Sequence, residues 1–177
     1  MLQIYKYIIK IQLMRNVQLP EYKGSMFRGA FGWALRNVVC ITKQKTCDNC
    51  ILKNQCSYFR IFETELPANK LSILRGIKKL PHPMIIHPPE TFKRYFEEGS
   101  ILEIGVTLFG DYVDFFPFVL FAFQQMGKSG IGSERVNFEV INVYAVNESD
   151  EKKIIFENSD NVLITSTERL TIFIKDE

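Results

Sequence analysis

The four cysteines of the chain, Cys40, Cys47, Cys50 and Cys56, lie within one stretch of seventeen residues. A C-x-x-C turn lets two thiolates reach one metal ion, and two more thiolates nearby complete a tetrahedral site of four sulfurs. Lysines at positions 43, 45 and 53 favour the thiolate form and offset its negative charge. The pattern predicts a structural metal site, with zinc ahead of an iron–sulfur cluster. Nothing in the sequence indicates secretion, so structural disulfides are not expected. The alternative to a metal site is therefore four reduced structural cysteines.

A glycine-rich stretch is the second group with chemical potential. Three glycines fall within six residues between a predicted helix and a predicted strand, and backbone N–H groups in such a loop can hold a phosphate. A nucleotide-binding P-loop is excluded because the helix precedes the loop instead of following it. A tight helix-to-strand turn explains the glycines equally well. The residues expected to contact a phosphate backbone are Gly127, Lys128, Ser129, Gly130, Gly132 and Arg135.

Residues suited to acid–base catalysis are few. The two histidines, His82 and His87, both lie next to prolines. Either can act as a general base, but a histidine in such an extended segment is more often a partly buried structural residue. No motif of a serine hydrolase or zinc protease occurs, and Asp111 and Asp114 fit a loop and a helix cap better than a metal pair.

Charge is distributed unevenly along the chain, although the whole carries only +2. The first 60 residues hold ten lysines and arginines against Glu21 and Asp48, whereas the remaining 117 residues are net acidic. Clustered basic side chains favour a polyanionic partner, with nucleic acid first. The alternative is a solvated basic face opposite an acidic one.

Length and hydropathy restrict the class of protein. A chain of 177 residues with 46% hydrophobic side chains can form one domain with its own core. The longest apolar run, residues 115–123, is too short to span a membrane, and Lys6 and Lys10 interrupt the apolar start of the chain. We therefore expect a soluble, cytoplasmic protein without a membrane partner.

The periodicity of apolar residues predicts an α+β fold. Strands are expected at residues 2–14, 58–65, 84–86, 101–109, 135–146, 154–156 and 170–174. Helices are expected at 25–39, capped by Ser25, and at 114–126, capped by Asp114 with Pro117 in its first turn; the second should be buried almost all round. This order predicts a ferredoxin-like, RRM-related βαββαβ antiparallel sheet with two helices on one face and extra β-hairpins. The expected domain spans 1–146, with a Cys-rich insertion at 40–56, and residues 147–177 form a hairpin extension or begin a second domain.

Several stretches resemble the CRISPR-associated RAMP superfamily, specifically its pre-crRNA-processing endoribonuclease family. They are LPEYKGSMFRGAFGWALRNVVC, the following C-x-x-C-x5-C-x-Y, PHPMIIHPP, GSILEIGVTLFGDYVDFFPFVLFAFQQMG and GIGSERVNFEV. The resemblance covers roughly residues 15–146 and implies a ferredoxin-like fold that is usually present twice. It implies binding of the CRISPR repeat RNA and metal-independent cleavage, in which a ribose 2′-OH attacks the adjacent phosphate.

The resemblance also assigns roles to residues. It places Gly24, Arg28, Gly29 and Arg36 at the RNA-facing entry of the first helix and Gly127, Gly130 and Gly132 in the glycine-rich loop. Many family members carry a catalytic histidine in or near the first helix, and residues 22–39 contain none. Tyr22, Lys23 and His82 are therefore the candidate catalytic residues, and Lys23 is also a candidate RNA contact. Expected partners are CRISPR repeat RNA and other CRISPR-associated proteins.

Three functions fit the sequence. The first is a repeat-RNA endoribonuclease, or its N-terminal portion. The second is a non-catalytic RAMP-type subunit that binds CRISPR RNA in an effector complex, which the missing histidine favours. The third is a metal-stabilised scaffold whose basic face docks an acidic protein. We predict RNA processing, with RNA binding as its core.

Overall fold

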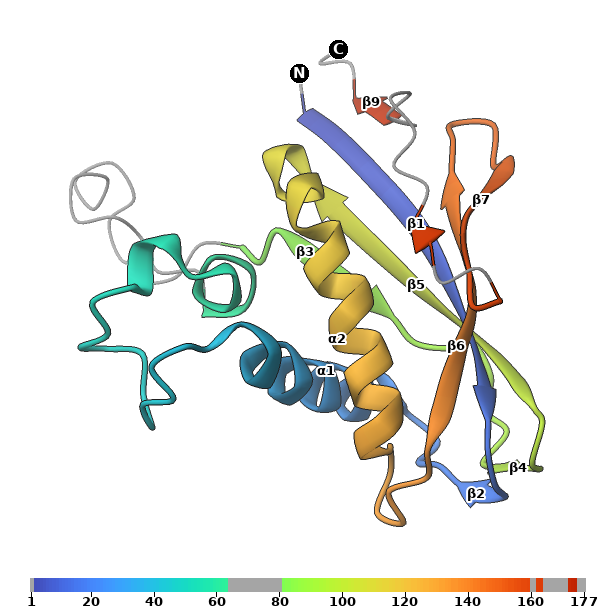
Figure 1. Ribbon diagram of the computed structural model, residues 1–177. Coiled ribbons are helices and arrows are strands. Elements are labelled where there is room, and N and C mark those ends of the chain that lie inside the picture. The colour runs from blue at the N-terminus through green and yellow to red at the C-terminus, as the bar shows by residue number, and fades with distance from the viewer. Residues whose placement is uncertain (1, 64–80, 160–161, 164–171, 175–177) are drawn as a thin grey trace.

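Strand β1 (Leu2–Leu13) runs through the middle of an antiparallel sheet. The computed structural model describes residues 2–63, 81–159, 162–163 and 172–174 of the chain, and it has a mixed α+β architecture (Figure 1). β1 pairs on one side with β5 (Ile101–Phe109) and on the other with β6 (Phe138–Val146). β3 (Met84–His87) pairs with β5 and forms one edge of the sheet, as expected for a segment flanked by prolines.

Further strands extend this sheet, and two short strands form a second, small sheet. β7 (Lys152–Glu157) pairs with β6, β8 (Val162–Leu163) pairs with β7, and β9 (Ile172–Ile174) pairs with the start of β1. The order along the sheet is therefore β3-β5-β1-β6-β7-β8. β2 (Val17–Gln18) and β4 (Tyr95–Phe96) form the two-stranded sheet.

Two helices cover one side of the large sheet (Figure 1). α1 (Gly24–Val39) connects β1 to the segment leading to β3, and α2 (Phe116–Ser129) connects β5 to β6 after the 3-10 turn η4 (Gly110–Phe115). The helices pack on each other through Phe31 and Phe123, whose ring centroids lie 5.1 Å apart. Tyr7 of β1 stacks on Phe116 of α2 with centroids 3.8 Å apart. The helices and the sheet therefore share one core.

Alternation along β1 separates the two faces of the sheet. Tyr5, Ile9 and Ile11 are buried under the helices, whereas Lys6 and Lys10 point to the opposite face. Lys10 forms an ion pair with Glu103 of β5 at 3.1 Å on that open face. The residues that could bind a ligand on the helical side are thus distinct from those on the open face.

Several local predictions are wrong. The stretch predicted as a strand at 58–65 forms a π-helix, η2 (Phe59–Glu63), as far as residue 63; its last two positions lie outside the described residues. α1 begins at Gly24 with Lys23 as its N-cap, so Ser25 lies inside the helix. α2 begins at Phe116 instead of after Asp114. Neither α1 nor α2 has a hydrogen bond from a side chain at its N-cap, so the predicted caps do not form.

The expectation that α2 is buried on nearly every side is also wrong. Phe118 and Phe121 on its outer face are 44% and 47% exposed. The rest of its apolar surface, including Leu120 and Phe123, is buried against β6 and α1. α2 therefore carries two aromatic side chains at the surface.

Residues 40–63 form a separate excursion from the sheet (Figure 1). They run from the end of α1 through the short 3-10 helix η1 (Lys53–Gln55) to η2, away from the strands. The predicted Cys-rich insertion at 40–56 belongs to this excursion. Its attachment to α1 places the cysteines beyond the C-terminal end of that helix, away from Gly24 at its start.

Candidate functional site

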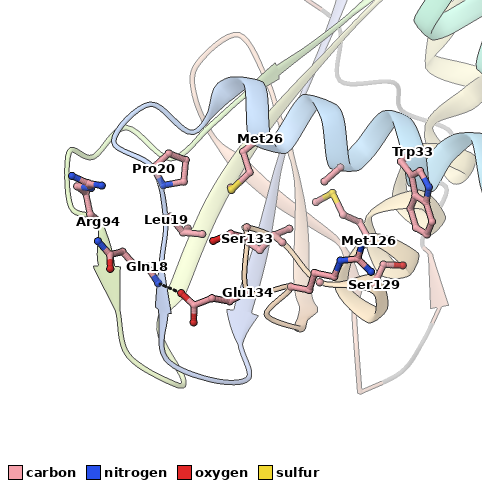
Figure 2. A pocket seen from close by; sticks show the side chains of 15 residues that line it. Gln18, Leu19, Pro20, Met26, Trp33, Arg94, Met126, Ser129, Ser133 and Glu134 are labelled. Carbon is pink, nitrogen blue, oxygen red and sulfur yellow. Dashed lines mark hydrogen bonds between the residues drawn. The ribbon is translucent and has the colours of Figure 1, made fainter.

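A cavity of about 790 Å³ opens between α1, the loop that follows α2, and the small two-stranded sheet (Figure 2). Met26, Ala30 and Trp33 line it from α1, because residues spaced three or four apart share one face of a helix. Figure 2 shows Arg94 at one end of the cavity and Trp33 at the other. We call this cavity the α1 groove.

The glycine-rich loop forms one wall of the α1 groove. Ile131 and Val136 exchange two backbone hydrogen bonds of 2.9 Å, which close the loop into a small hairpin. Gly130 and Gly132 have φ angles of +82° and +74°, a conformation that favours glycine. A Cβ on Gly130 would lie 2.3 Å from the carbonyl oxygen of Arg135. These glycines are therefore required by the turn itself.

Two residues of the predicted phosphate loop, Gly127 and Lys128, do not line the α1 groove. Gly127 packs against β6, since a Cβ there would lie 2.2 Å from the carbonyl oxygen of Phe138, so its role is packing. Asn137 donates to the carbonyl oxygens of Gly127 and Lys128 at 3.2 and 2.6 Å and caps the end of α2. Lys128 is exposed beside the groove without lining it. The predicted residues that do line the groove are Ser129, Gly130, Gly132 and Arg135.

The groove combines cations with an aromatic surface. Arg94 and Arg135 are exposed, and Trp33 is 60% exposed although it is the sole tryptophan of the chain. Glu134 adds one negative charge and accepts a hydrogen bond from the backbone N–H of Gln18 at 3.5 Å. Such a surface can stack a base on the indole and bind phosphates through the arginines.

Sequence reasoning missed Trp33 and Arg94. A tryptophan off the apolar stripe of a predicted helix is a signal that could have identified the first. Arg94 has no such signal, because the pairing of β2 with β4 alone brings it to the groove.

Arg28 lies on a different face of α1 and contacts His82. Its guanidinium donates to Nε2 of His82 at 3.0 Å and lies 4.9 Å from the ring centroid of Phe62. Because an arginine only donates, Nε2 of His82 is the unprotonated acceptor in this contact. The three side chains line a cavity of about 370 Å³ with Pro81. Two residues predicted for separate roles, Arg28 and His82, are therefore in direct contact.

Tyr22 and Lys23 do not join His82. They line another cavity, of about 430 Å³, together with His87, whose Nε2 lies 3.0 Å from the hydroxyl oxygen of Thr107. Lys23 is buried, and its ammonium donates to the carbonyl oxygens of Glu21 at 3.1 Å and Thr91 at 2.8 Å. Burial lowers the pKa of Lys23, with Glu21 opposing the shift. An RNA contact by Lys23 has no support from this position.

Arg36 is also engaged within the protein. It donates to the carbonyl oxygens of Gln44 and Lys45 and lies over the ring of Tyr58 at 5.8 Å. Burial, together with the nearby Glu63 carboxylate, raises the pKa of Tyr58 to about 12. Arg36 thus holds the cysteine segment against α1 instead of facing the groove.

The four cysteines are free thiols that line one cavity of about 20 Å³. Burial raises the pKa of the Cys47 thiol. A hydrogen bond from Thr42, followed by backbone N–H groups of Leu52 and Lys53, lowers the pKa of Cys50. Within the described ranges, no three His, Cys, Asp or Glu side chains are close enough together to hold a metal ion.

Comparison with known proteins adds a family. The family model of the AF_1859 N-terminal domain matches residues 2–168 of the chain. The chain belongs to this family. It is 26% identical over 125 residues to an uncharacterized protein of Archaeoglobus fulgidus, a match that covers 71% of the chain. The match covers 40% of that protein, so the chain spans about two fifths of the relative's length.

Over the parts of the chain that the structure describes, no helix has both the length and the hydropathy to cross a bilayer.

Proposed function

We propose that this domain binds single-stranded RNA in the α1 groove. The observation that carries the proposal is that Trp33, Arg94, Arg135 and the glycine-rich loop, from three separate parts of the sequence, line one cavity. Base–aromatic stacking and arginine–phosphate contacts are the two interactions that single-strand binding surfaces combine. The volume of about 790 Å³ has room for a nucleotide, since small-molecule sites typically range from about 300 to 1,000 Å³.

The loop offers further groups for a phosphate. The backbone N–H groups of Gly132 and Ser133 form no hydrogen bond within the described part of the chain, and both residues line the groove. Together with the Arg135 guanidinium they supply donors of the kind that bind phosphate oxygens in a nest. Glu134 at the same wall disfavours a second phosphate beside it, which restricts how a strand can lie.

The strand order supports a ferredoxin-like, RRM-related fold as part of the same proposal. The units β1-α1-β3 and β5-α2-β6 each cross over on the helical side, and their strands interleave as β3-β5-β1-β6. This arrangement, with the resemblance of residues 15–146 to the CRISPR repeat-processing endoribonucleases, makes a CRISPR repeat RNA the proposed ligand. The fold alone would not identify a function, because similar sheets host many activities.

We further propose that the chain is part of a protein that cleaves this RNA, with Arg28 and His82 as the cleavage pair. Arg28 would leave His82 for the scissile phosphate, and Nε2 of His82 would then accept the proton of the 2′-OH. The 2′-oxygen attacks phosphorus, the 5′-oxygen leaves and takes up a proton from water, and the products are a 2′,3′-cyclic phosphate and a 5′-OH. The 3.0 Å contact between Arg28 and His82 is what supports this pair over Tyr22 and Lys23.

Binding is tested with a fluorescently labelled single-stranded CRISPR repeat RNA from the same genome, titrated with the 177-residue chain. Arg94→Gln and Arg135→Gln should each weaken binding by roughly 5- to 30-fold, since a charge-assisted contact contributes about 1–2 kcal/mol. Lys6→Gln on the open face of the sheet is the control and should bind normally. Equal affinity of all variants would refute the groove as the interface.

Cleavage is tested separately with the same RNA and a 2′-deoxy version on a denaturing gel. Products that end in a cyclic phosphate, absent with the 2′-deoxy RNA and with His82→Ala, support the cleavage pair. Tight binding of an RNA that remains intact supports the alternative, a non-catalytic CRISPR-RNA-binding subunit. Binding that ignores both RNA and salt would support the protein-docking scaffold.

A further inference from the structure

Four cysteines join the end of α1 to the start of η2. Cys40 ends the helix, with its N–H donating to the carbonyl oxygen of Arg36 at 2.9 Å. Cys56 precedes η2, and its carbonyl oxygen accepts from the N–H of Arg60 at 3.0 Å. Cys47 and Cys50 lie between them, and all four side chains are half-buried. The excursion therefore has a thiol at each end and two in its middle.

Successive tight turns direct these thiols to a common cavity. The N–H of Cys50 donates to the carbonyl oxygen of Cys47 at 3.2 Å, and the N–H of Lys53 donates to that of Cys50 at 3.1 Å. Each bond returns the chain after three residues, and all four cysteines line the same cavity of about 20 Å³. The hydroxyl of Thr42 lies 3.9 Å from the sulfur of Cys40 and 3.6 Å from that of Cys50.

The cavity has the size and charge for a single ion. A volume of about 20 Å³ holds one water-sized particle and excludes an organic ligand. Four thiolates around a divalent cation leave a net charge of −2, which Arg36 and Lys53 at the cavity wall offset. Sulfur donors in a set of four match the tetrahedral preference of zinc.

We propose that a zinc ion bound by Cys40, Cys47, Cys50 and Cys56 ties the end of α1 to η2. Because no three of the thiols are close enough to hold a metal as they stand, the ion would draw the sulfurs inward across the small cavity. A site closed by four protein ligands has no open position for substrate, so its role is structural. The proposal is independent of RNA binding.

The position of η2 explains what the ion would stabilise. Phe62 of η2 packs against Gly32, where a Cβ would lie 2.5 Å from the ring, and beneath the guanidinium of Arg28. The ring of Tyr58 lies under the guanidinium of Arg36, a residue of α1 that follows Gly32 by one helical turn. Holding both ends of residues 40–56 therefore keeps one aromatic face of the excursion against α1, including the ring that supports Arg28.

The experiment measures zinc in the native 177-residue chain, purified without chelator and dialysed. Elemental analysis should give one zinc per chain, and cobalt substitution should give the visible bands of a tetrahedral thiolate site. Cys50→Ser should lose most of the zinc and unfold at a lower temperature, whereas Asn49→Ser, in the same turn, should keep both. A thiol reagent should modify all four cysteines only after zinc is released.

Some results would overturn the proposal. They are wild-type protein without zinc even after refolding with zinc and reductant, iron with inorganic sulfide in place of zinc, or two disulfides by mass spectrometry. If Cys50→Ser fails to fold, the zinc content, cobalt spectrum and thiol reactivity of the wild-type chain still decide. RNA binding is measured in parallel, so its failure leaves the zinc result unchanged.

Discussion

Trp33→Ala is the sharpest test of the α1 groove. The indole is 60% exposed, lines the groove and lies outside the buried core of the helices. Replacement by alanine opens no internal cavity and retains high helix propensity, so the free energy of unfolding should change by less than about 0.5 kcal/mol. A change in RNA affinity would therefore report the groove and not the fold.

The expected loss follows from stacking. A base stacked on an aromatic side chain contributes roughly 1–3 kcal/mol by alanine substitution, which is about 5- to 140-fold in the dissociation constant. Trp33→Phe should retain part of that affinity because it keeps an aromatic face. Phe118→Ala is the matched control, because Phe118 is a surface aromatic at 44% exposure that does not line the groove.

The assay can report the contact directly. Trp33 is the one tryptophan in the sequence, so intrinsic tryptophan emission monitors this position alone. Titration with repeat RNA should quench the emission at the same midpoint as the binding measured by anisotropy. Unchanged emission together with an unchanged affinity of Trp33→Ala would refute base stacking in the groove.

Three further substitutions test other parts of the structure by thermal or urea unfolding. Gly130→Ala should cost more than about 1 kcal/mol, because φ is +82° and the new Cβ would meet the carbonyl oxygen of Arg135 at 2.3 Å; normal stability would contradict the loop geometry. Phe31→Ala should cost about 3–5 kcal/mol by leaving a void against Phe123, and a cost below 1 kcal/mol would contradict this packing. Lys23 has a folded pKa below its ordinary value of 10.5, so the unfolded chain binds more protons between the two values and stability should rise with pH there. Lys23→Met should lack that rise, and an identical pH dependence in both proteins would exclude the effect.

The main elements were predictable because their apolar periods are strong. β1, β5 and β6 alternate, α1 repeats at helical spacing, and Pro117 marks the first turn of α2, so the sequence alone located all five within a few residues. The stretch at 58–65 failed because aromatic and β-branched residues favour a strand by propensity. Tertiary packing overrides that preference: Ile61 is buried, and Phe62 fits against Gly32 only where no Cβ is present.

The candidate site was only partly predictable for a different reason. A local pattern reveals a loop such as 127–132, whose glycines are needed by its own backbone. A groove formed by distant segments has no local pattern, so Arg94 reaches it through the pairing of β2 with β4. Residues of one helix can also lie on different faces of it. Trp33 faces the groove, whereas Arg28 and Arg36 contact residues 40–63.

The salt dependence of RNA binding can show whether RNA contacts the whole basic N-terminal third of the chain or mainly the few cations at the α1 groove. The first 60 residues have a surplus of eight positive charges, yet Lys23 is buried on carbonyl oxygens, Arg36 holds the cysteine segment, and Arg28 is proposed to reach only the scissile phosphate. The groove instead offers Arg94 and Arg135, with Lys128 beside it. At about 0.7 per phosphate for a single strand, two to four contacts, with Arg28 as the fourth, predict a slope of log affinity against log salt between roughly −1.4 and −2.8, whereas eight would give about −5.6. A measured slope near −5 would mean that RNA follows the basic N-terminal third, and the groove would no longer account for the interface.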